Sequence, residues 1–301
     1  MNSKKWSVTD QPMSGNNRML LGFSSIFFAL ALLVTPYGAA QTSPVPIRFL
    51  LTFDDGPAAN IYNNSTEQVL DVLAHNTVQP GIKAIFFTQT RAVNGGGTAI
   101  GRKLMQREWS EGHLLAFHTA TPRHSNHRYL TDQELAETLQ TGISDLTGIT
   151  GVAPQLVRPP FWNYDLRTFT AYQQAGLHML LTDLSANDGK IWGVNFSFHK
   201  HSNLLKMLTD FKPHWLAGEL PVVDGAVPVI VTFHDVNTYT SNHIEVYLQI
   251  LLQVASELDM PTTREPFYNQ RDAIERAALA RTISDGSHRE QLPGFWDWLW
   301  H

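Results

Sequence analysis

The chain has no cysteine among its 301 residues, against 13 histidines. A disulfide framework and thiolate metal ligands are therefore excluded, and a metal site must use imidazole and carboxylate groups. Basic residues are also few, because 22 Lys and Arg stand against 27 Asp and Glu, for a formal net charge of −5. With no basic run, the sequence predicts no nucleic-acid partner. A composition that is 43% hydrophobic and 16% charged suits a globular protein with a sizeable core.

The first forty residues have the pattern of an export signal. Basic residues precede an uncharged apolar run at Met19–Val34, and the small residues Gly38-Ala39-Ala40 lie directly before Gln41. The apolar run is short for a full membrane span. We therefore predict a signal peptide over residues 1–40 that is cleaved on export to the periplasm or the extracellular space, with no stable membrane insertion afterwards. An uncleaved N-terminal anchor is the alternative.

After Gln41, short apolar runs alternate with segments of helical period, which is typical of repeated βα units. Strands are predicted at Ile47–Phe53, Ala84–Thr88, Leu114–Phe117, Gln155–Val157, Met179–Thr182 and Val229–Phe233. Helices are predicted at Thr66–Ala74, Ile100–Trp109, from the capping box at Thr131 through Leu146, and at Leu166–Ala175, Asn203–Phe211, His243–Leu258 and Gln270–Thr282. The pattern indicates one α/β domain over residues 41–301, with an insertion at 190–226. Its C-terminal extension is helical and rich in tryptophan, and those tryptophans either pack on the domain or line a sugar site.

Ionisable residues follow five of the predicted strands where each strand ends. They are Asp54 and Asp55, His118, Arg158, Asp183, and His234 with Asp235. In a barrel of parallel strands the carboxyl ends converge on one face, so we predict that these side chains share a site. Side chains alternate along a strand, so Asp54 and Asp55 can meet only where the chain turns, and Gly56-Pro57 supplies that turn. Their repulsion requires positive charge nearby, from a metal on one acid and Arg158 beside the other.

A histidine cluster suggests the metal. The stretch FHTATPRHSNHRYL contains His118, His124 and His127 within ten residues. Two neutral imidazoles and Asp55 would form a three-ligand site with open positions for water, as in catalytic zinc centres. Three solvent-exposed loop histidines are the alternative.

Taken in order, the motifs resemble those of the polysaccharide deacetylase family, also called the NodB-homology or carbohydrate esterase family 4. The matching stretches are KAIFFTQT on the second strand and the five motifs TFDDGP, EGHLLAFHTATPRH, RPPFW, TDLSAND and VIVTFHD. The resemblance extends from about Arg48 to Leu258. It implies a distorted (β/α)7-type barrel.

The resemblance also implies a role for each matching residue. Asp54 would be the general base and His234 the general acid, while Asp55, His118 and a second histidine would bind the metal. His124 is preferred to His127 because the sequence from it to the next helix keeps the family's spacing. Arg158 would orient Asp54, Asp183 would hold His234, and the backbone N–H of Phe161 would help to form an oxyanion hole. Phe161 and Trp162 follow a strand end, so they either wall the substrate pocket or belong to the core.

The sequence departs from the family pattern at three places, and the last two leave substrate preference open. His118 and His124 are six residues apart where the family has four. In the fourth motif Asp183 and Asp188 are five residues apart, and a glycine replaces the family's tryptophan. Asp188 is thus either part of the site or a turn residue. Thr232 stands where an apolar residue usually meets the acetyl methyl group.

The function implied is metal-dependent hydrolysis of N-acetyl groups on an amino-sugar polymer, which could be peptidoglycan, a chitin-like glycan or an exopolysaccharide. Zn²⁺ is the expected ion, with Co²⁺ or another divalent ion as alternatives. One rival reading is hydrolysis of O-acetyl esters on a polysaccharide. Another is a secreted carbohydrate-binding relative that has lost turnover. If Asp54 and Asp55 repel each other, Asp54→Asn is expected to stabilise the fold slightly.

Overall fold

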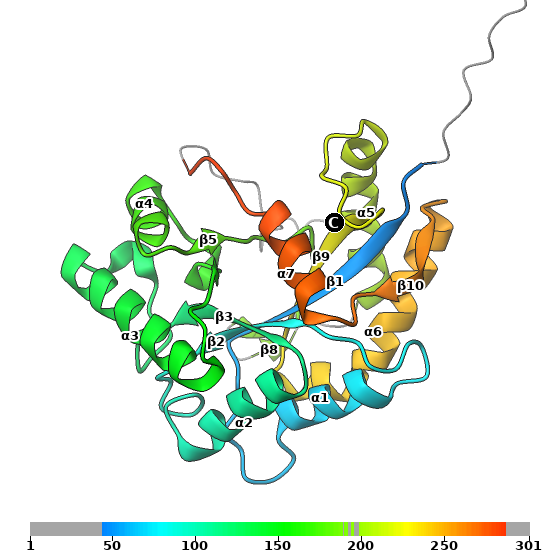
Figure 1. Ribbon diagram of the computed structural model, residues 1–301. Helices are drawn as coiled ribbons and strands as arrows, with labels where there is room; N and C mark the ends of the chain where they lie inside the picture. The colour runs from blue at the N-terminus through cyan, green and yellow to red at the C-terminus, as the bar shows by residue number, and fades with distance from the viewer. Residues whose placement is uncertain (1–43, 189, 192–193, 196–198, 287–301) are drawn as a thin grey trace, which may run out of the picture. The chain divides into compact units, whose positions relative to one another are not determined.

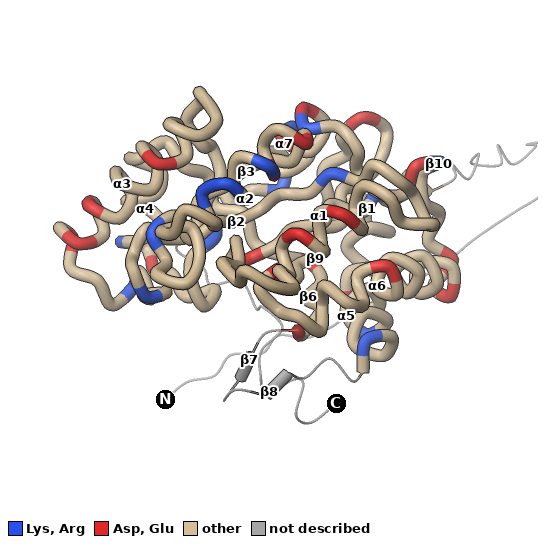
Figure 2. Tube along the Cα trace, turned by 90° about the horizontal axis from the view of Figure 1, so that it is seen from below, with Lys and Arg blue, Asp and Glu red and all other residues tan. Residues whose placement is uncertain are grey.

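The computed structural model describes residues 44–188, 190–191, 194–195 and 199–286. The predicted signal peptide and the C-terminal tryptophans lie outside these residues. Among the described residues, no helix has the length and apolarity needed to cross a bilayer. Lys and Arg are interspersed with Asp and Glu along the described chain, as the near balance of charges predicts (Figure 2).

Helices and strands alternate along the chain (Figure 1). The strands of the main sheet are β1 (Ile47–Asp54), β2 (Ile85–Gln89), β3 (Leu114–Thr119), β4 (Leu156–Val157), β5 (His178–Met179), β6 (Leu184–Ser185), β9 (Val227–His234) and β10 (Thr262–Phe267). The short strands β7 (Lys190–Ile191) and β8 (Val194–Asn195) pair only with each other. The helices are α1 (Ser65–His75), α2 (Ala99–Ser110), α3 (Asp132–Thr150), α4 (Leu166–Gln174), α5 (Lys200–Leu216), α6 (Thr238–Glu257) and α7 (Arg271–Ala280), with 3-10 turns η1 (His127–Tyr129) and η2 (Pro160–Trp162).

The main sheet is parallel throughout and has the order β5-β4-β3-β2-β1-β9-β6. β10 pairs with the first half of β1, and β2 pairs with its second half. The sheet is curled, but within the described residues it does not close, because β5 and β6 form its two ends (Figure 1). The prediction of a distorted α/β barrel is thus confirmed.

The sequence does not predict the strand β10, and one of the predicted strands is wrong. The run Met179–Thr182 reads as a single strand, but β5 ends at Met179 and a second short strand, β6, begins at Leu184. β5 pairs with β4, whereas β6 pairs with β9. The chain therefore crosses from one edge of the sheet to the other within four residues.

The two faces of the sheet bury separate apolar clusters. On one face, side chains such as Phe49, Leu51 and Phe53 pack against α1 to α6. On the other face, residues of opposite parity such as Leu50 pack against α7, which contributes Ala273, Ile274, Ala277 and Ala278. Full burial of each large apolar side chain stabilises the fold by about 1.5–3 kcal/mol. Because side chains alternate along a strand, even-numbered residues of β1 lie on the face of α7.

Two glycines of α3 are expected to respond in opposite directions to alanine. A Cβ at Gly142 would overlap the ring of the buried Phe117, so Gly142→Ala should destabilise the fold by about 1–3 kcal/mol. Gly148 is exposed and a Cβ there would meet nothing within 4 Å, so Gly148→Ala should stabilise by about 0.5–1 kcal/mol. Urea unfolding of both variants measures the two changes. A stabilised Gly142→Ala would contradict the packing of α3 on β3.

Candidate active site

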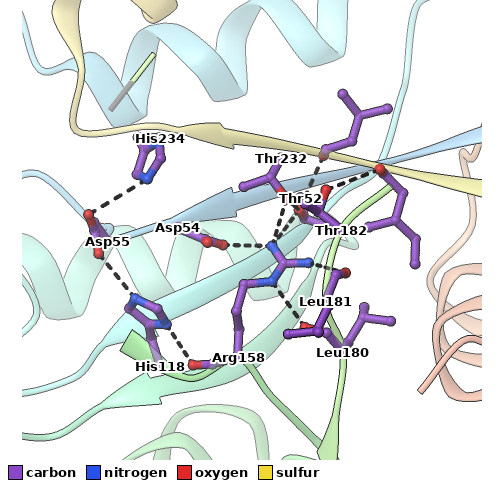
Figure 3. A network of polar contacts seen from close by, with 12 residues as sticks. Thr52, Asp54, Asp55, His118, Arg158, Leu180, Leu181, Thr182, Thr232 and His234 are labelled. Atoms are coloured by element: carbon purple, nitrogen blue, oxygen red, sulfur yellow. Dashed lines mark hydrogen bonds and ion pairs between the residues drawn. The ribbon is translucent and has the colours of Figure 1, made fainter. Parts of the chain in front are cut away.

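Neighbouring strands bring polar side chains together at their carboxyl ends. β1 and β9 run side by side in register, so that Thr52 lies beside Thr232 and Asp54 beside His234. The alternation along β1 places Thr52 and Asp54 on the face that α7 covers. Figure 3 shows these side chains converging with others from adjacent strands. The convergence that the strand ends predict is therefore present.

Arg158, which follows β4, lies at the centre of this region and is fully buried. Its Nη1 donates to Asp54 Oδ1 at 2.8 Å, to Thr52 Oγ1 at 2.7 Å and to Thr232 Oγ1 at 3.0 Å (Figure 3). An isolated charge in such a position costs several kcal/mol, but here the guanidinium and the carboxylate compensate each other. The contact that was expected to orient Asp54 is present.

The remaining donors of Arg158 bind backbone carbonyl groups. Nε donates to the carbonyl of Leu180 at 3.1 Å and Nη2 to that of Leu181 at 3.0 Å. The rings of Phe87 and Trp162 lie against the guanidinium, with centroids at 4.1 and 5.0 Å from Cζ. The guanidinium plane is thus fixed both by hydrogen bonds and by aromatic contacts.

Directly after Asp54, the last residue of β1, the backbone turns at Asp55. Its φ of 70° places it in the left-handed region, so its side chain does not follow the alternation of β1. Asp55 Oδ1 lies 3.1 Å from His118 Nε2 and 3.3 Å from His124 Nε2, and the two imidazole nitrogens are 3.1 Å apart. One ligand atom from each of the three residues lies within 4.8 Å of the others. A carboxylate and two imidazoles in this arrangement suit a divalent cation.

The protonation states of the three side chains also suit a cation. His118 Nδ1 lies 2.8 Å from the carbonyl of Arg158, so this nitrogen donates and Nε2 keeps its lone pair toward Asp55. Burial lowers the pKa of His124 to about 4, which keeps that imidazole neutral. Burial would raise the pKa of Asp55, but the adjacent His118 side chain and the charge of His234 hold it well below its usual range. Asp55 therefore remains ionised.

His127 lies apart from the cluster. Its Nδ1 is 2.9 Å from the hydroxyl of Tyr172 and its Nε2 is 3.1 Å from Thr119 Oγ1, and it is fully buried. Burial lowers its pKa to about 3. Because both ring nitrogens already bind core hydroxyl groups, the geometry favours His124 over His127 as the third ligand.

Asp188, rather than Asp183, holds His234. Asp188 Oδ1 lies 2.8 Å from His234 Nδ1, and its Oδ2 accepts the backbone N–H of His234 at 2.8 Å. Thr240 Oγ1 also donates to this fully buried carboxylate. The expectation that Asp183 holds His234 is therefore wrong. Asp188 is part of the site and not only a turn residue.

Asp188 rather than Asp183 reaches His234 because the strand β6 lies between the two acids in sequence. β6 pairs with β9 at Val231 and Thr232, so Asp183 precedes it and Asp188 follows it at the carboxyl end. Asp183 instead accepts the backbone N–H of Ile230 at 2.8 Å and a donor of Arg281. Its carboxylate thus lies deeper along β9 than His234 does.

Phe161 and Trp162 have different surroundings. Phe161 has a φ of 60° and is 57% exposed, and its ring stacks on His124 at a centroid distance of 4.4 Å. Trp162 is half-buried and packs against the core and over Arg158. Phe161 therefore lies at the solvent side of the site, whereas Trp162 covers the buried arginine.

Two residues around Asp55 were not assigned a role from the sequence. Gln89 Nε2 donates to Asp55 Oδ1 at 3.1 Å. Asp235 is fully buried, accepts a hydrogen bond from Thr66 Oγ1, and lies so close to Gly56 that a Cβ there would overlap its carboxylate. This contact explains why glycine follows Asp55. The only sequence signal was the position of Asp235 directly after the β9 strand.

A family model described as polysaccharide deacetylase matches residues 43–180. Over these residues the chain has the sequence pattern of the polysaccharide deacetylase family. It is 29% identical to a chitin deacetylase from Pestalotiopsis sp. over 154 residues, which are 51% of this chain and 47% of that protein. It is 25% identical to a peptidoglycan-N-acetylglucosamine deacetylase from Listeria monocytogenes over 240 residues, which are 79% of this chain and 42% of that protein. The chain spans less than half the length of either relative.

A solved structure agrees with the family fold. The chitin deacetylase from the fungal pathogen Colletotrichum lindemuthianum superimposes with a TM-score of 0.50 at 22% sequence identity, covering 72% of this chain and 85% of the other. At this identity the likeness concerns the fold. The curled parallel sheet described above therefore has the fold found in that structure.

Substitution of the histidines should distinguish the candidate metal cluster from the buried core. His118→Ala and His124→Ala each remove one of three ligands and should lower the content of bound divalent metal at least tenfold. His127→Ala should retain the metal but lower the thermal midpoint, because it leaves the buried hydroxyl group of Tyr172 without this partner, at a cost of about 1–3 kcal/mol. Elemental analysis and thermal unfolding provide the measurements. Metal loss in His127→Ala with full occupancy in His124→Ala would reverse the assignment.

Proposed function

We propose that this chain hydrolyses N-acetyl groups of an amino-sugar polymer. The observation that carries the proposal is the position of one candidate metal cluster between Asp54, held by a buried arginine, and His234, held by a buried aspartate. A base and an acid on either side of one metal are what amide hydrolysis requires. The names of the chitin and peptidoglycan deacetylases among the relatives support the same substrate class.

Asp55, His118 and His124 would hold the metal, and Zn²⁺ suits one carboxylate and two imidazoles. Co²⁺ or another divalent ion is the alternative. When bound, the ion would supply Lewis acidity to the acetyl carbonyl and to the attacking water. Each of the three residues already presents one candidate ligand atom to the other two.

Asp54 is the proposed general base. Arg158 donates to its Oδ1, which fixes the carboxylate and leaves Oδ2 to accept a proton from the attacking water. The backbone N–H of Phe161 is the proposed oxyanion donor, a type of contact worth about 3 kcal/mol in the transition state. Asp54 and Asp55 thus have separate tasks, the first in proton transfer and the second in holding the metal.

His234 is the proposed general acid. Burial alone would lower its pKa, but the carboxylates of Asp188, Asp55 and Asp54 together raise it to about 10. His234 is therefore protonated at neutral pH. Its Nδ1 is engaged by Asp188, and Nε2, which lies 3.9 Å from Asp55 Oδ2, faces the cluster. From this position Nε2 can protonate the leaving amine, which otherwise departs poorly.

The polysaccharide substrate and the leading segment together suggest where the protein acts. We propose that it is exported and meets its polymer in the periplasm or outside the cell. N-terminal sequencing of the exported protein should then find a start at or near Gln41.

An acetate-release screen tests the function. The metal-loaded protein is incubated with chitooligosaccharide, peptidoglycan, an acetylated exopolysaccharide and acetylated xylan, and both acetate and free amine are measured. Acetate with an equal amount of amine from one of the amino-sugar polymers is the expected result. Acetate release from xylan alone would show an ester hydrolase instead. Glycan binding without any release would show a binding protein.

Substitutions of the two adjacent acids should differ in their effects on metal content and on rate. Asp54→Asn is nearly isosteric and leaves the ligands in place, so metal content should persist while kcat falls by about 10²-fold or more. Asp55→Asn should lower metal content as well as rate. Near-normal turnover of Asp54→Asn would exclude Asp54 as the base, and equal metal loss in both variants would mean that both acids bind the metal.

The structure reverses the expected effect of Asp54→Asn on stability. Repulsion between the acids predicts a small gain, but Asp54 is the carboxylate partner of the fully buried Arg158. Its neutralisation leaves a buried cation uncompensated, and breaking such a pair typically costs about 3–5 kcal/mol. The thermal midpoint should therefore fall.

A further inference from the structure

The open edge of the sheet lies directly beside Arg158. Between β5 and β6 the chain crosses from one edge to the other through Leu180–Asp183, a segment that we call the crossing segment. Two of its carbonyl groups, those of Leu180 and Leu181, accept hydrogen bonds from Arg158 (Figure 3). The orientation of the guanidinium, and through it that of Asp54, therefore depends on where this segment lies.

The crossing segment is tied to β9 at its far end. The N–H of Asp183 donates to the carbonyl of Ile230 at 3.1 Å, and the N–H of Ile230 donates back to Asp183 Oδ2 at 2.8 Å. Thr182 Oγ1 donates to the same carbonyl of Ile230 at 3.2 Å. This end of the segment thus depends on the carboxylate of Asp183 as well as on backbone groups.

The chain that follows α7 holds the segment from the other side. Arg281 donates through Nη2 to Asp183 Oδ1, the oxygen that Ile230 does not use. Two residues later, the N–H of Ile283 donates to the carbonyl of Met179 at 2.9 Å, next to the start of the segment. α7 itself packs in the same apolar cluster as Leu180. Arg281 is therefore placed by a packed helix on one side and a backbone hydrogen bond on the other.

Arg281 also supplies a positive charge beside the carboxylate of Asp183. Asp183 and Arg281 are 12% and 13% exposed, so both charges lie largely out of solvent. Among the described residues, the cations that act on Asp183 are Arg281 and Arg158. Without Arg281, the carboxylate of Asp183 would retain only Arg158 as a positive neighbour. Burial already raises the pKa of Asp183, so the loss of Arg281 would favour its neutral form and weaken its hold on the crossing segment.

We propose that Arg281 is a positioning residue for Asp54. It neutralises Asp183, which fixes the crossing segment, and the carbonyl groups of that segment fix Arg158 against Asp54. Arg281 touches neither the candidate metal ligands nor the proposed substrate side of the site. This inference rests on the proposed function, because the role of Asp54 as the base gives the positioning its consequence.

The helix α7, which ends directly before Arg281, offers a matched control. Arg276 pairs with Asp224 at 2.7 Å, and the two side chains are 56% and 46% exposed. Exposed pairs contribute little to stability, and the hydrogen bond of this one goes to Asp224, which lies outside the crossing segment. Arg276→Met therefore removes an arginine ion pair of α7 without affecting Arg158.

The experiment compares Arg281→Met, Arg281→Gln, Arg281→Lys and Arg276→Met in the full-length, metal-loaded protein. kcat and KM are measured on the polymer identified by the acetate-release screen, at a temperature well below the lowest thermal midpoint. We expect kcat of Arg281→Met and Arg281→Gln to fall about tenfold or more, with KM and metal content unchanged. Arg281→Lys should recover most of kcat, and Arg276→Met should match the wild type. A structural role alone would lower the midpoint but leave kcat intact, and that result would overturn the proposal.

A second readout does not require turnover. The Arg158 Nε–H is buried and bound to the carbonyl of Leu180, so it should give a slowly exchanging ¹⁵N NMR signal, assigned by its loss in Arg158→Lys. In Arg281→Gln this signal should shift and exchange faster, and in Arg276→Met it should not change. An unchanged signal in Arg281→Gln would overturn the proposal even if the wild type releases no acetate. A changed signal in an inactive wild-type background would support the positioning and reject only the proposed function.

Discussion

The buried pair between Arg158 and Asp54 is the interaction on which the rest of the site depends. A guanidinium without solvent contact requires an acceptor for every donor and a carboxylate for its charge. Here the acceptors come from both sheet edges and from the centre: threonines of β1 and β9, carbonyl groups between β5 and β6, and Asp54. Thr232 contributes to this arrangement, because its hydroxyl group lies within hydrogen-bond distance of both Arg158 Nη1 and Thr52 Oγ1.

The adjacent acids are compatible because the backbone separates them. Asp54 ends a regular strand and faces Arg158, whereas Asp55 has a φ of 70° and faces His118 and His124. Each carboxylate therefore has its own positive or potentially cationic partner, and the two charges are not confined to one pocket. Gly56 allows this turn, because any side chain at that position would overlap Asp235.

Short-range pattern predicts much of this molecule, and the failures have a common physical cause. The long strands, the helices and the convergence of Asp54, Asp55, His118, Arg158 and His234 follow from apolar periodicity and from where each strand ends. β6 is only two residues long, too short for a periodic signal, so Asp183 was given the place of Asp188. β10 has exposed and charged residues and pairs with only half of β1. The pairing of Arg281 with Asp183 spans 98 residues and leaves no local pattern.

Because the sheet does not close within the described residues, Arg158 binds backbone groups at its open edge as well as the proposed base. In a closed barrel, backbone hydrogen bonds between neighbouring strands would satisfy the carbonyl groups of Leu180 and Leu181. Here a side chain satisfies them, and the same side chain fixes the proposed base. Any change that moves β5 relative to β9 must therefore move Arg158, and with it Asp54. The contacts that stabilise this edge of the sheet are thus also the contacts that would orient the proposed base. Under the proposed function, α7 and the residues after it would therefore help to position Asp54, although they lie far from the candidate metal ligands in sequence.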